Sequence, residues 1–259
     1  MKRFNCLYVG CGRHRLKGFI HAETNLDKQT EGLAPPEIIC DMTKSIPLPD
    51  NSCDLIFSRH TLEHLTYIQL VNHLLLCNRI IKDDGYIRMC LPDFDLIIKD
   101  YLNKKYIPNK ELMNEIDMIG PNENYTDSFI NRILYPDHFY LHNYDTLSRV
   151  LDKCGFSNIH KKEPGKTSID DNVIQGELLS CEKGEINNEI IIEAQKRKKP
   201  SIQFLTSRHK TNLINKLLIF FNLKISKFDH RKPRVPQLNW LKEKKLRIKN
   251  FFTKKEFFK

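Results

Sequence analysis

A short apolar run that ends in two closely spaced glycines constrains the fold of this chain more than any other feature. Residues 7–12 read LYVGCG, and acidic side chains follow further along. An apolar run broken in this way predicts a strand, a tight turn and a helix, the local geometry that holds a nucleotide-like ligand at the end of a strand. The pattern therefore favours an enzyme.

Apolar strand-like runs alternate with helical patterns beyond this turn, which predicts an α/β fold with crossover helices. Seven strands are expected, at residues 6–9, 19–23, 38–40, 54–58, 86–91, 156–159 and 189–194. Helices are expected at residues 67–81, 94–106 and 144–155, and a glycine turn at residues 82–85 ends the first of them. Residues 104–135 show too little pattern to place and form a predicted insertion.

Positive charge is concentrated in the final part of the chain. Residues 1–199 hold 26 Lys and Arg against 29 Asp and Glu, whereas residues 200–259 hold 16 against 3. The first part is thus near −3 and the second near +13, which accounts for the net charge of +10. We divide the chain accordingly into a domain at residues 1–199 and a basic tail at residues 200–259. The tail interleaves its basic residues with Phe, Leu, Ile and Trp240, which predicts amphipathic helix.

A basic amphipathic tail favours an anionic partner. An anionic membrane surface is the first expectation, because apolar insertion and basic charge act together there. Self-association or a solvated appendage comes second, and phosphate contact with nucleic acid is less favoured. The longest apolar stretch of the tail, residues 213–228, is interrupted by polar side chains and is too short in apolar content to span a membrane.

The eight cysteines indicate a reducing compartment. They are scattered through apolar runs without a C-x-x-C pair, and the start of the chain carries no signal peptide pattern. We therefore expect reduced cysteines in a cytoplasmic protein, which the tail can attach peripherally to the inner membrane face.

Five pieces of sequence carry a resemblance to a known family. They are LYVGCG at 7–12, GFIHAE at 18–23, CDM at 40–42, PLPDNSCDLIFSRHTLEHL at 47–65 and GYIRMCLPD at 85–93. Their order and spacing resemble class I S-adenosylmethionine-dependent methyltransferases, in particular the small bacterial branch often associated with surface-polysaccharide synthesis. The resemblance covers about residues 4–196. It implies a Rossmann-like fold, with a seven-stranded, mostly parallel sheet sandwiched by helices, and S-adenosylmethionine as cofactor.

The resemblance assigns the loop after the first strand to the cofactor: Val9, Gly10, Cys11 and Gly12. Absent side chains let the backbone approach the amino-acid end of the cofactor. The loop lacks the third glycine of a dinucleotide fingerprint, which favours a nucleoside without phosphates. Glu23 stands where the family usually has Asp, and it would accept hydrogen bonds from the ribose hydroxyls. Asp27 would take this role if the strand runs longer, and a solvated loop carboxylate is the alternative for Glu23.

The same resemblance assigns the adenine and the methyl group. Asp41 would meet the adenine amino group, with the Met42 backbone N–H and side chain beside the ring. The alternative for Asp41 is a cap for a helical segment that starts at Thr43. Ser58 and Arg59, directly after the fourth strand, would line the floor near the reactive methyl group.

A general base would assist transfer to a hydroxyl acceptor. The candidates are His60, Asp93 after the fifth strand, and His138 or His142 before the last helix. Each histidine can instead be a packing imidazole, and Asp93 can instead cap the helix that begins near Phe94.

Two histidine motifs raise the question of a metal. Residues 60–64 spell H-x-x-E-H, a zinc-peptidase pattern, and residues 138–142 repeat the H-x-x-x-H spacing. The first motif directly follows a predicted strand of a parallel sheet, and no third ligand is signposted. We therefore expect no metal, and a zinc hydrolase is disfavoured.

The function expected from the sequence is O-methylation of a glycan or lipid-linked sugar, with S-adenosylmethionine as donor. The acceptor rests on the family analogy alone. The alternatives are an RNA methyltransferase, which lacks an N-P-P-[YF]-like turn after the fourth strand, and a non-catalytic methyltransferase-like binding subunit. The acceptor pocket is expected near the insertion at residues 104–135, and the sequence leaves the oligomeric state open.

Overall fold

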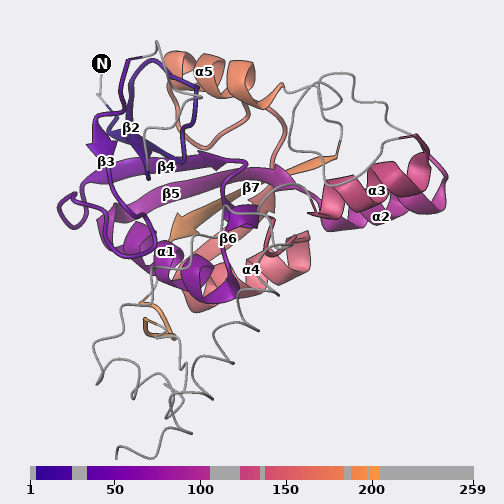
Figure 1. Cartoon of the computed structure of the whole chain (residues 1–259). Helices are drawn as coiled ribbons and strands as arrows, with labels where there is room; N and C mark the ends of the chain where they lie inside the picture. The colour runs from indigo at the N-terminus through magenta and orange to yellow at the C-terminus, as the bar shows by residue number, and fades with distance from the viewer. Residues whose placement is uncertain are drawn as a thin grey trace, which may run out of the picture. The chain divides into compact units, whose positions relative to one another are not determined.

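The computed structural model describes residues 4–24, 34–105, 123–134, 138–183, 188–197 and 199–204. These residues form a seven-stranded sheet with helices on both faces (Figure 1). The strands are β1 (Cys6–Val9), β2 (Phe19–Glu23), β3 (Ile38–Ile39), β4 (Cys53–Arg59), β5 (Ile81–Pro92), β6 (Phe156–Lys161) and β7 (Glu189–Lys196). Their order across the sheet is β3-β2-β1-β4-β5-β7-β6.

The sheet is parallel except at β7. Val9 at the end of β1 pairs with Ala22 of β2 and Ser58 of β4, and both pairings are parallel. β7 runs antiparallel between β5 and β6, so that its first residue, Glu189, pairs with Pro92 at the end of β5. The parallel strands thus end, and β7 begins, at one side of the sheet. We call this the carboxyl edge and define it by these residues: Val9, Glu23, Ile39, Arg59, Pro92 and Glu189.

Helices cover the two faces unequally. On one face lie α1 (Tyr67–Ile80) and α4 (Tyr144–Lys153), and on the other lies α5 (Asn172–Glu182) (Figure 1). The buried residues of α1 and α4 belong to one apolar cluster with β1, β4 and β5, whereas those of α5 belong to a second cluster. A 3-10 helix, η2 (Leu62–His64), leads from β4 into α1.

Local sequence fixes where the two helices of the first face begin. Thr66 and Gln69 form a capping box at the start of α1, and Asn143 and Thr146 form another at the start of α4. The cap of α4 is therefore Asn143, and the helix ends before Gly155, whose φ is +93°.

α2 (Phe94–Leu102) and α3 (Tyr125–Leu134) pack against each other beside the sheet (Figure 1). The rings of Tyr101 and Phe129 stack at a centroid distance of 4.3 Å. α3 lies inside the predicted insertion, where the sequence pattern indicated no element. α2 ends four residues before the expected end of its helix.

An ion cluster is buried between β5, β7 and α5. Arg88 is fully buried and donates to both carboxylate oxygens of Glu182, at 2.6 and 2.8 Å, and to Glu193 at 3.2 Å. Its two remaining N–H groups donate to the carbonyl oxygens of Glu163 and Lys166. All five guanidinium N–H groups thus have acceptors, which is what makes a buried cation tolerable. We call Arg88, Glu182 and Glu193 the Arg88 cluster.

The structure confirms the predicted seven-stranded sheet and corrects two details. No helix follows the glycine turn, because residues 10–18 form turns that lead directly into β2. The predicted turn at residues 82–85 is a bulge in a longer strand, since the register of β4 and β5 shifts from Cys53 with Ile81 to Leu55 with Tyr86. Asp84, with φ of +65°, bends the chain there.

The fold continues past the predicted boundary at residue 199. The Ser201 N–H donates to the Lys153 carbonyl oxygen at 2.8 Å, and Ile202 packs against the core of the first face. The predicted helical tail lies outside the described residues from residue 205 on. In the part of the chain that the structure describes, no helix is long and apolar enough to cross a membrane.

Candidate functional site

The glycine loop lies at the carboxyl edge, directly after β1. Gly10 and Gly12 have φ angles of +64° and +47°, a region that favours glycine. A Cβ at Gly10 would overlap the side chain of Thr61, so the loop also needs glycine for space. At Gly12 nothing lies within 4 Å of the position that a Cβ would take, which leaves room above the loop for a ligand. The backbone is therefore open to a ligand at Gly12, and the contact of this loop with the cofactor stays a prediction.

Arg15 holds this loop from below and was not predicted. Its Nη1 donates to the carbonyl oxygens of Gly12 and His14 at 2.8 Å each, and to the Cys11 sulfur at 3.3 Å. Its Nε donates to the Ala34 carbonyl oxygen at 3.0 Å. The predicted cofactor residue Cys11 is fully buried beneath the loop, so its backbone rather than its thiol can face a ligand.

Glu23 ends β2 beside the glycine loop. One of its oxygens accepts the Gly12 N–H at 2.9 Å, and the other accepts the Thr24 N–H at 2.7 Å. Each carboxylate oxygen has a second lone pair that can accept a hydroxyl. The carboxylate is thus fixed against the glycine loop rather than free in solvent. The predicted contact with the ribose hydroxyls requires it at this position beside the loop. Asp27 lies outside the described residues.

Asp41 and Met42 follow β3. Asp41 accepts the Thr43 N–H at 3.0 Å and pairs with Lys44 at 2.6 Å, so it holds a turn, and no helix begins at Thr43 for it to cap. The Met42 side chain is packed in the core, which leaves its backbone as the part that can face an adenine ring. His73 of α1 contacts the Met42 carbonyl oxygen at 3.1 Å. The adenine contacts of Asp41 and Met42 stay a prediction.

The residues that end β4 form a second ion cluster, at the carboxyl edge. His60 contacts Glu63 at 3.0 Å through Nδ1 and Glu189 at 2.7 Å through Nε2, and Arg59 donates to Glu189 at 3.1 Å. We call Arg59, His60, Glu63 and Glu189 the His60 cluster. His60 has a φ of +48°, so its backbone is held in the left-handed region while its ring bridges the two carboxylates. Glu189 was not predicted.

The predicted proton acceptor His60 is set up as a cation instead. Burial lowers its pKa, but the hydrogen bonds to Glu189 and Glu63 outweigh burial and raise the pKa to about 9. Burial raises the pKa of Glu189, and the contacts with His60 and Arg59 more than reverse this and bring it to about 2. At neutral pH both ring nitrogens carry protons, so this geometry does not support His60 as the general base. Ser58 pairs with Val9 and is buried, and its place near the reactive methyl group stays a prediction.

Asp93 follows β5 and caps α2. Its side chain accepts the Asp95 N–H at 3.0 Å, the capping role considered for it. Burial raises the pKa of Asp93, although the hydrogen bond from Asp95 opposes the shift. The Asp93 backbone pairs with His142, which lines a cavity of about 220 Å³. The cavity lies between the start of α1 and α4, with these further lining residues: Tyr67, Tyr140, Thr146, Arg149, Val150 and Lys153.

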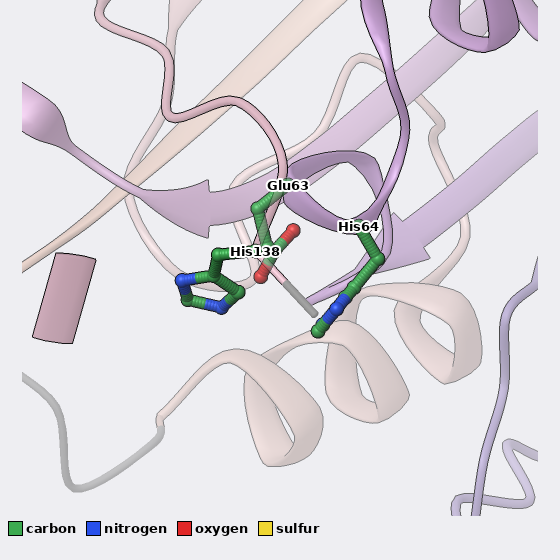
Figure 2. Close-up of side chains that lie close together, drawn as sticks. All are labelled: Glu63, His64 and His138. Carbon is green, nitrogen blue, oxygen red and sulfur yellow. The ribbon is translucent and has the colours of Figure 1, made fainter. Parts of the chain in front are cut away.

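The histidine motifs separate in space. His60 turns toward Glu189, whereas Glu63 and His64 of η2 lie beside His138 (Figure 2). The His64 and His138 rings have centroids 5.0 Å apart at an interplanar angle of 66°. His138 is therefore placed beside Glu63 and His64, and neither sequence motif survives intact as a cluster.

Part of the chain is similar to a family of known proteins. The family described as "Methyltransferase domain" matches residues 7–89, which contain β1 to β4, the glycine loop and most of β5. Residues 7–89 are thus similar to a methyltransferase domain. The match supports a class I S-adenosylmethionine-dependent methyltransferase, and S-adenosylmethionine is the cofactor of this domain. No curated protein matches the chain significantly.

Solved structures that match about three quarters of the chain are distant in sequence. An S-adenosylmethionine-dependent methyltransferase from Archaeoglobus fulgidus is 20% identical, with 74% of this chain and 86% of that chain covered and a TM-score of 0.46. A possible histamine N-methyltransferase from Thermotoga maritima is 15% identical, with 76% and 84% covered and a TM-score of 0.44. Phosphoethanolamine N-methyltransferase 2 of Haemonchus contortus, in complex with S-adenosyl-L-methionine, is 15% identical, with 76% and 50% covered and a TM-score of 0.44.

The carboxyl edge of the sheet fits S-adenosylmethionine. Gly10 and Gly12 would admit its amino-acid end, and the Glu23 carboxylate stands beside them for the ribose hydroxyls. The bound cofactor would supply a methyl group already activated for attack. What remains for the chain is to align the acceptor with that group and to exclude water.

Proposed function

We propose that this chain transfers a methyl group from S-adenosylmethionine to a hydroxyl group of a glycan or a lipid-linked sugar. The cavity beside Asp93 supports this proposal most directly. Tyr67 and Tyr140 present ring surface of the kind that packs on a sugar, while Arg149 and Lys153 supply positive charge for a phosphate linkage. A sugar attached to a lipid through phosphate carries both features. The family resemblance at residues 7–93 points to the same class of acceptor.

Asp93 is the residue we assign to the acceptor proton. It lies one residue beyond β5, and its backbone pairs with His142 of the cavity. A carboxylate with a raised pKa accepts a proton better than an ordinary one does. His60 would instead hold Arg59 and Glu189 in fixed positions at the end of β4, through the contacts that keep its ring protonated.

Acceptor screening with methyl-labelled S-adenosylmethionine tests the proposal. The acceptors are a polyprenyl diphosphate sugar, a free sugar phosphate, phosphoethanolamine and transfer RNA. We expect label on the sugar hydroxyl of the first two. Label on RNA or on the amine would overturn the proposal, and S-adenosylmethionine binding without transfer to any acceptor would favour a non-catalytic subunit.

Two substitutions test the residue roles, with an exposed arginine as control. Asp93→Asn should lower kcat by about 10²–10⁴-fold with the cofactor affinity unchanged. Arg149→Gln should raise KM for the phosphate-bearing acceptor with a smaller change in kcat. Arg197→Gln removes an arginine whose guanidinium is half exposed and pairs with Asp84, and it should leave both constants unchanged.

We propose further that the basic tail binds anionic membrane surface, which would bring the protein to lipid-linked acceptors at the inner face of a membrane. The support is the +13 charge of residues 200–259, interleaved with apolar residues. The full chain should sediment with vesicles that contain anionic lipid and release at high salt, and it should not sediment with neutral vesicles. Equal binding to both vesicle types, or tighter binding to RNA, would contradict this.

A further inference from the structure

Glu63, His64 and His138 form a compact cluster outside the residues assigned to the cofactor. A ligand atom from each of the three lies within 4.8 Å of the other two (Figure 2). The cluster joins two segments that are distant in sequence, η2 and the stretch before α4. Backbone bonds hold these segments together, since the N–H groups of Phe139 and Tyr140 donate to the Glu63 carbonyl oxygen at 2.8 and 3.3 Å. The arrangement therefore does not depend on the side chains alone.

The Glu63 carboxylate supplies a second, independent observation. Its side chain is fully buried, and one oxygen contacts His60 at 3.0 Å. The other oxygen, Oε2, is also buried and has no hydrogen-bond partner among the residues that the structure describes. A buried carboxylate oxygen without a donor is costly, so such an atom points to a cation or donor that is not part of the chain.

We propose that Glu63, His64 and His138 bind a divalent transition-metal ion, and that the ion is zinc. Two imidazoles and one carboxylate are a ligand set that zinc uses, with a fourth position for water or another ligand. Magnesium and calcium prefer sets made of oxygen atoms, which this cluster does not offer.

The surroundings of the three side chains favour ligation. His60 holds Glu63 through Oε1, which orients the carboxylate and leaves Oε2 for the metal. His138 is hydrogen-bonded to the backbone of Arg132, a contact of the kind that fixes the ring of a metal-binding histidine. The planes of the His64 and His138 rings are inclined at 66°. The rings are therefore not stacked face to face, an arrangement that would keep an ion out.

This ligand set differs from the one that either histidine motif predicts. A peptidase-like site would use His60 with His64, and the H-x-x-x-H spacing would use His138 with His142. In the structure His60 contacts Glu189, and His142 belongs to the cavity wall rather than to the cluster. Each motif therefore gives one histidine to the cluster. Substitutions can distinguish the proposed ligand set from the two sets that the motifs predict.

An ion at this position would fasten residues 138–140 to η2. Tyr140, two residues after His138, lines the cavity beside Asp93. Metal binding would thus set the position of one wall of that cavity. The metal site itself does not depend on which acceptor the cavity takes.

Zinc binding to the purified, untagged full-length chain tests the proposal. After metal removal, calorimetric titration with zinc should show about one ion per chain. His64→Gln and His138→Gln should each weaken zinc binding by at least about 100-fold. His142→Gln should retain it and is the matched control, whereas His60→Gln, which removes a contact of Glu63 rather than a ligand, should weaken it less than His64→Gln does. Binding of S-adenosylmethionine by each variant reports that the domain is folded.

Cobalt substitution identifies the ligands directly. The cobalt form should show the visible bands of a nitrogen and oxygen set, without the near-ultraviolet charge-transfer band of a cysteine ligand. Absent binding in the full chain, a sulfur band, or unchanged zinc affinity in both His64→Gln and His138→Gln would overturn the proposal. If either variant fails to fold, the cobalt spectrum of the unsubstituted chain decides between the proposed set and a cysteine site.

Discussion

The two ion clusters of this protein differ in how completely they are satisfied. In the Arg88 cluster every guanidinium N–H has an acceptor, and the side chains are buried. In the His60 cluster the Arg59 Nε and the Glu63 Oε2 have no hydrogen-bond partner among the described residues. The first cluster lies within the sheet and the second at its carboxyl edge. A saturated cluster can only hold the fold together, whereas an unsaturated one at a ligand-binding edge has capacity left for another group.

Removing the cation of the saturated cluster should have the largest effect on stability. Arg88→Met leaves Glu182 buried without its counter-charge and leaves Glu193 with only the longer contact to Lys162, so we expect the free energy of unfolding to fall by about 3–5 kcal/mol. Lys162→Met is the control, because Lys162 pairs with the same Glu193 from a more exposed position, at 3.5 Å, and should cost less than about 1 kcal/mol. Urea midpoints of both variants measure the difference. Similar losses in the two would show that the cluster does not act as a unit.

The contribution of His73, which has no carboxylate beside it, to the free energy of unfolding should depend on pH in the opposite sense to that of His60, which lies between two carboxylates. Burial lowers the pKa of His73 from 6.5 to about 4, with the Met42 carbonyl oxygen as its contact. Between these values the unfolded chain binds a proton that the folded chain does not, so His73 makes stability fall as the pH drops from about 6.5 to 4. The full effect approaches about 3 kcal/mol at pH 4.

His73→Leu should remove the contribution of His73 to the slope of the free energy of unfolding against pH. The contributions of His138 and His142 to that slope should remain. The measurement is the free energy of unfolding of both chains in urea at several pH values from 7 down to 4. An unchanged slope in the variant would show that His73 is not held neutral by burial.

A change in the His60 cluster should cause the smallest loss of stability but a larger loss of turnover. Glu189→Gln removes the charge that His60 and Arg59 share, which should cost about 1–3 kcal/mol. Because these side chains border the site, kcat should fall by up to about 100-fold through misplacement. Glu163→Gln changes an exposed carboxylate and is the control. A variant that loses stability without any loss of kcat would place the His60 cluster with the Arg88 cluster as purely structural.

The sequence predicted the strands well because buried parallel strands are short apolar runs between turn residues. β1 and β2 begin and end where predicted, and the glycine loop lies at the carboxyl edge as expected. α5 was missed because Gly176 interrupts its pattern and only part of one face is buried, so packing and the Asp171 cap carry it. Residues 82–85, KDDG, favour a turn and a bulge alike, so the sequence predicts a turn where the structure has a bulge.

The site was less predictable, because its partners are far apart in the chain. Glu189 contacts His60 across 129 sequence positions, and no local pattern marks that pair. Arg15 and Thr61 shape the glycine loop through tertiary contacts that a motif does not encode. H-x-x-E-H did mark the right neighbourhood, but His60 contacts Glu63 and Glu189, and the histidine that joins Glu63 and His64 in the cluster is His138.

The reversed direction of β7 has a consequence for folding during synthesis. In the described sheet β7 lies between β5 and β6 and pairs with β6. Strand β6 therefore leaves the ribosome before β7, the strand that will join it to the sheet. Until residues 189–196 emerge, β5 has an open edge, Arg88 lacks Glu193, and His60 and Arg59 lack their shared carboxylate. A nascent chain that ends before β7 can therefore form the glycine loop early but completes neither ion cluster. Assembly of both clusters is a single late event, timed by the last strand.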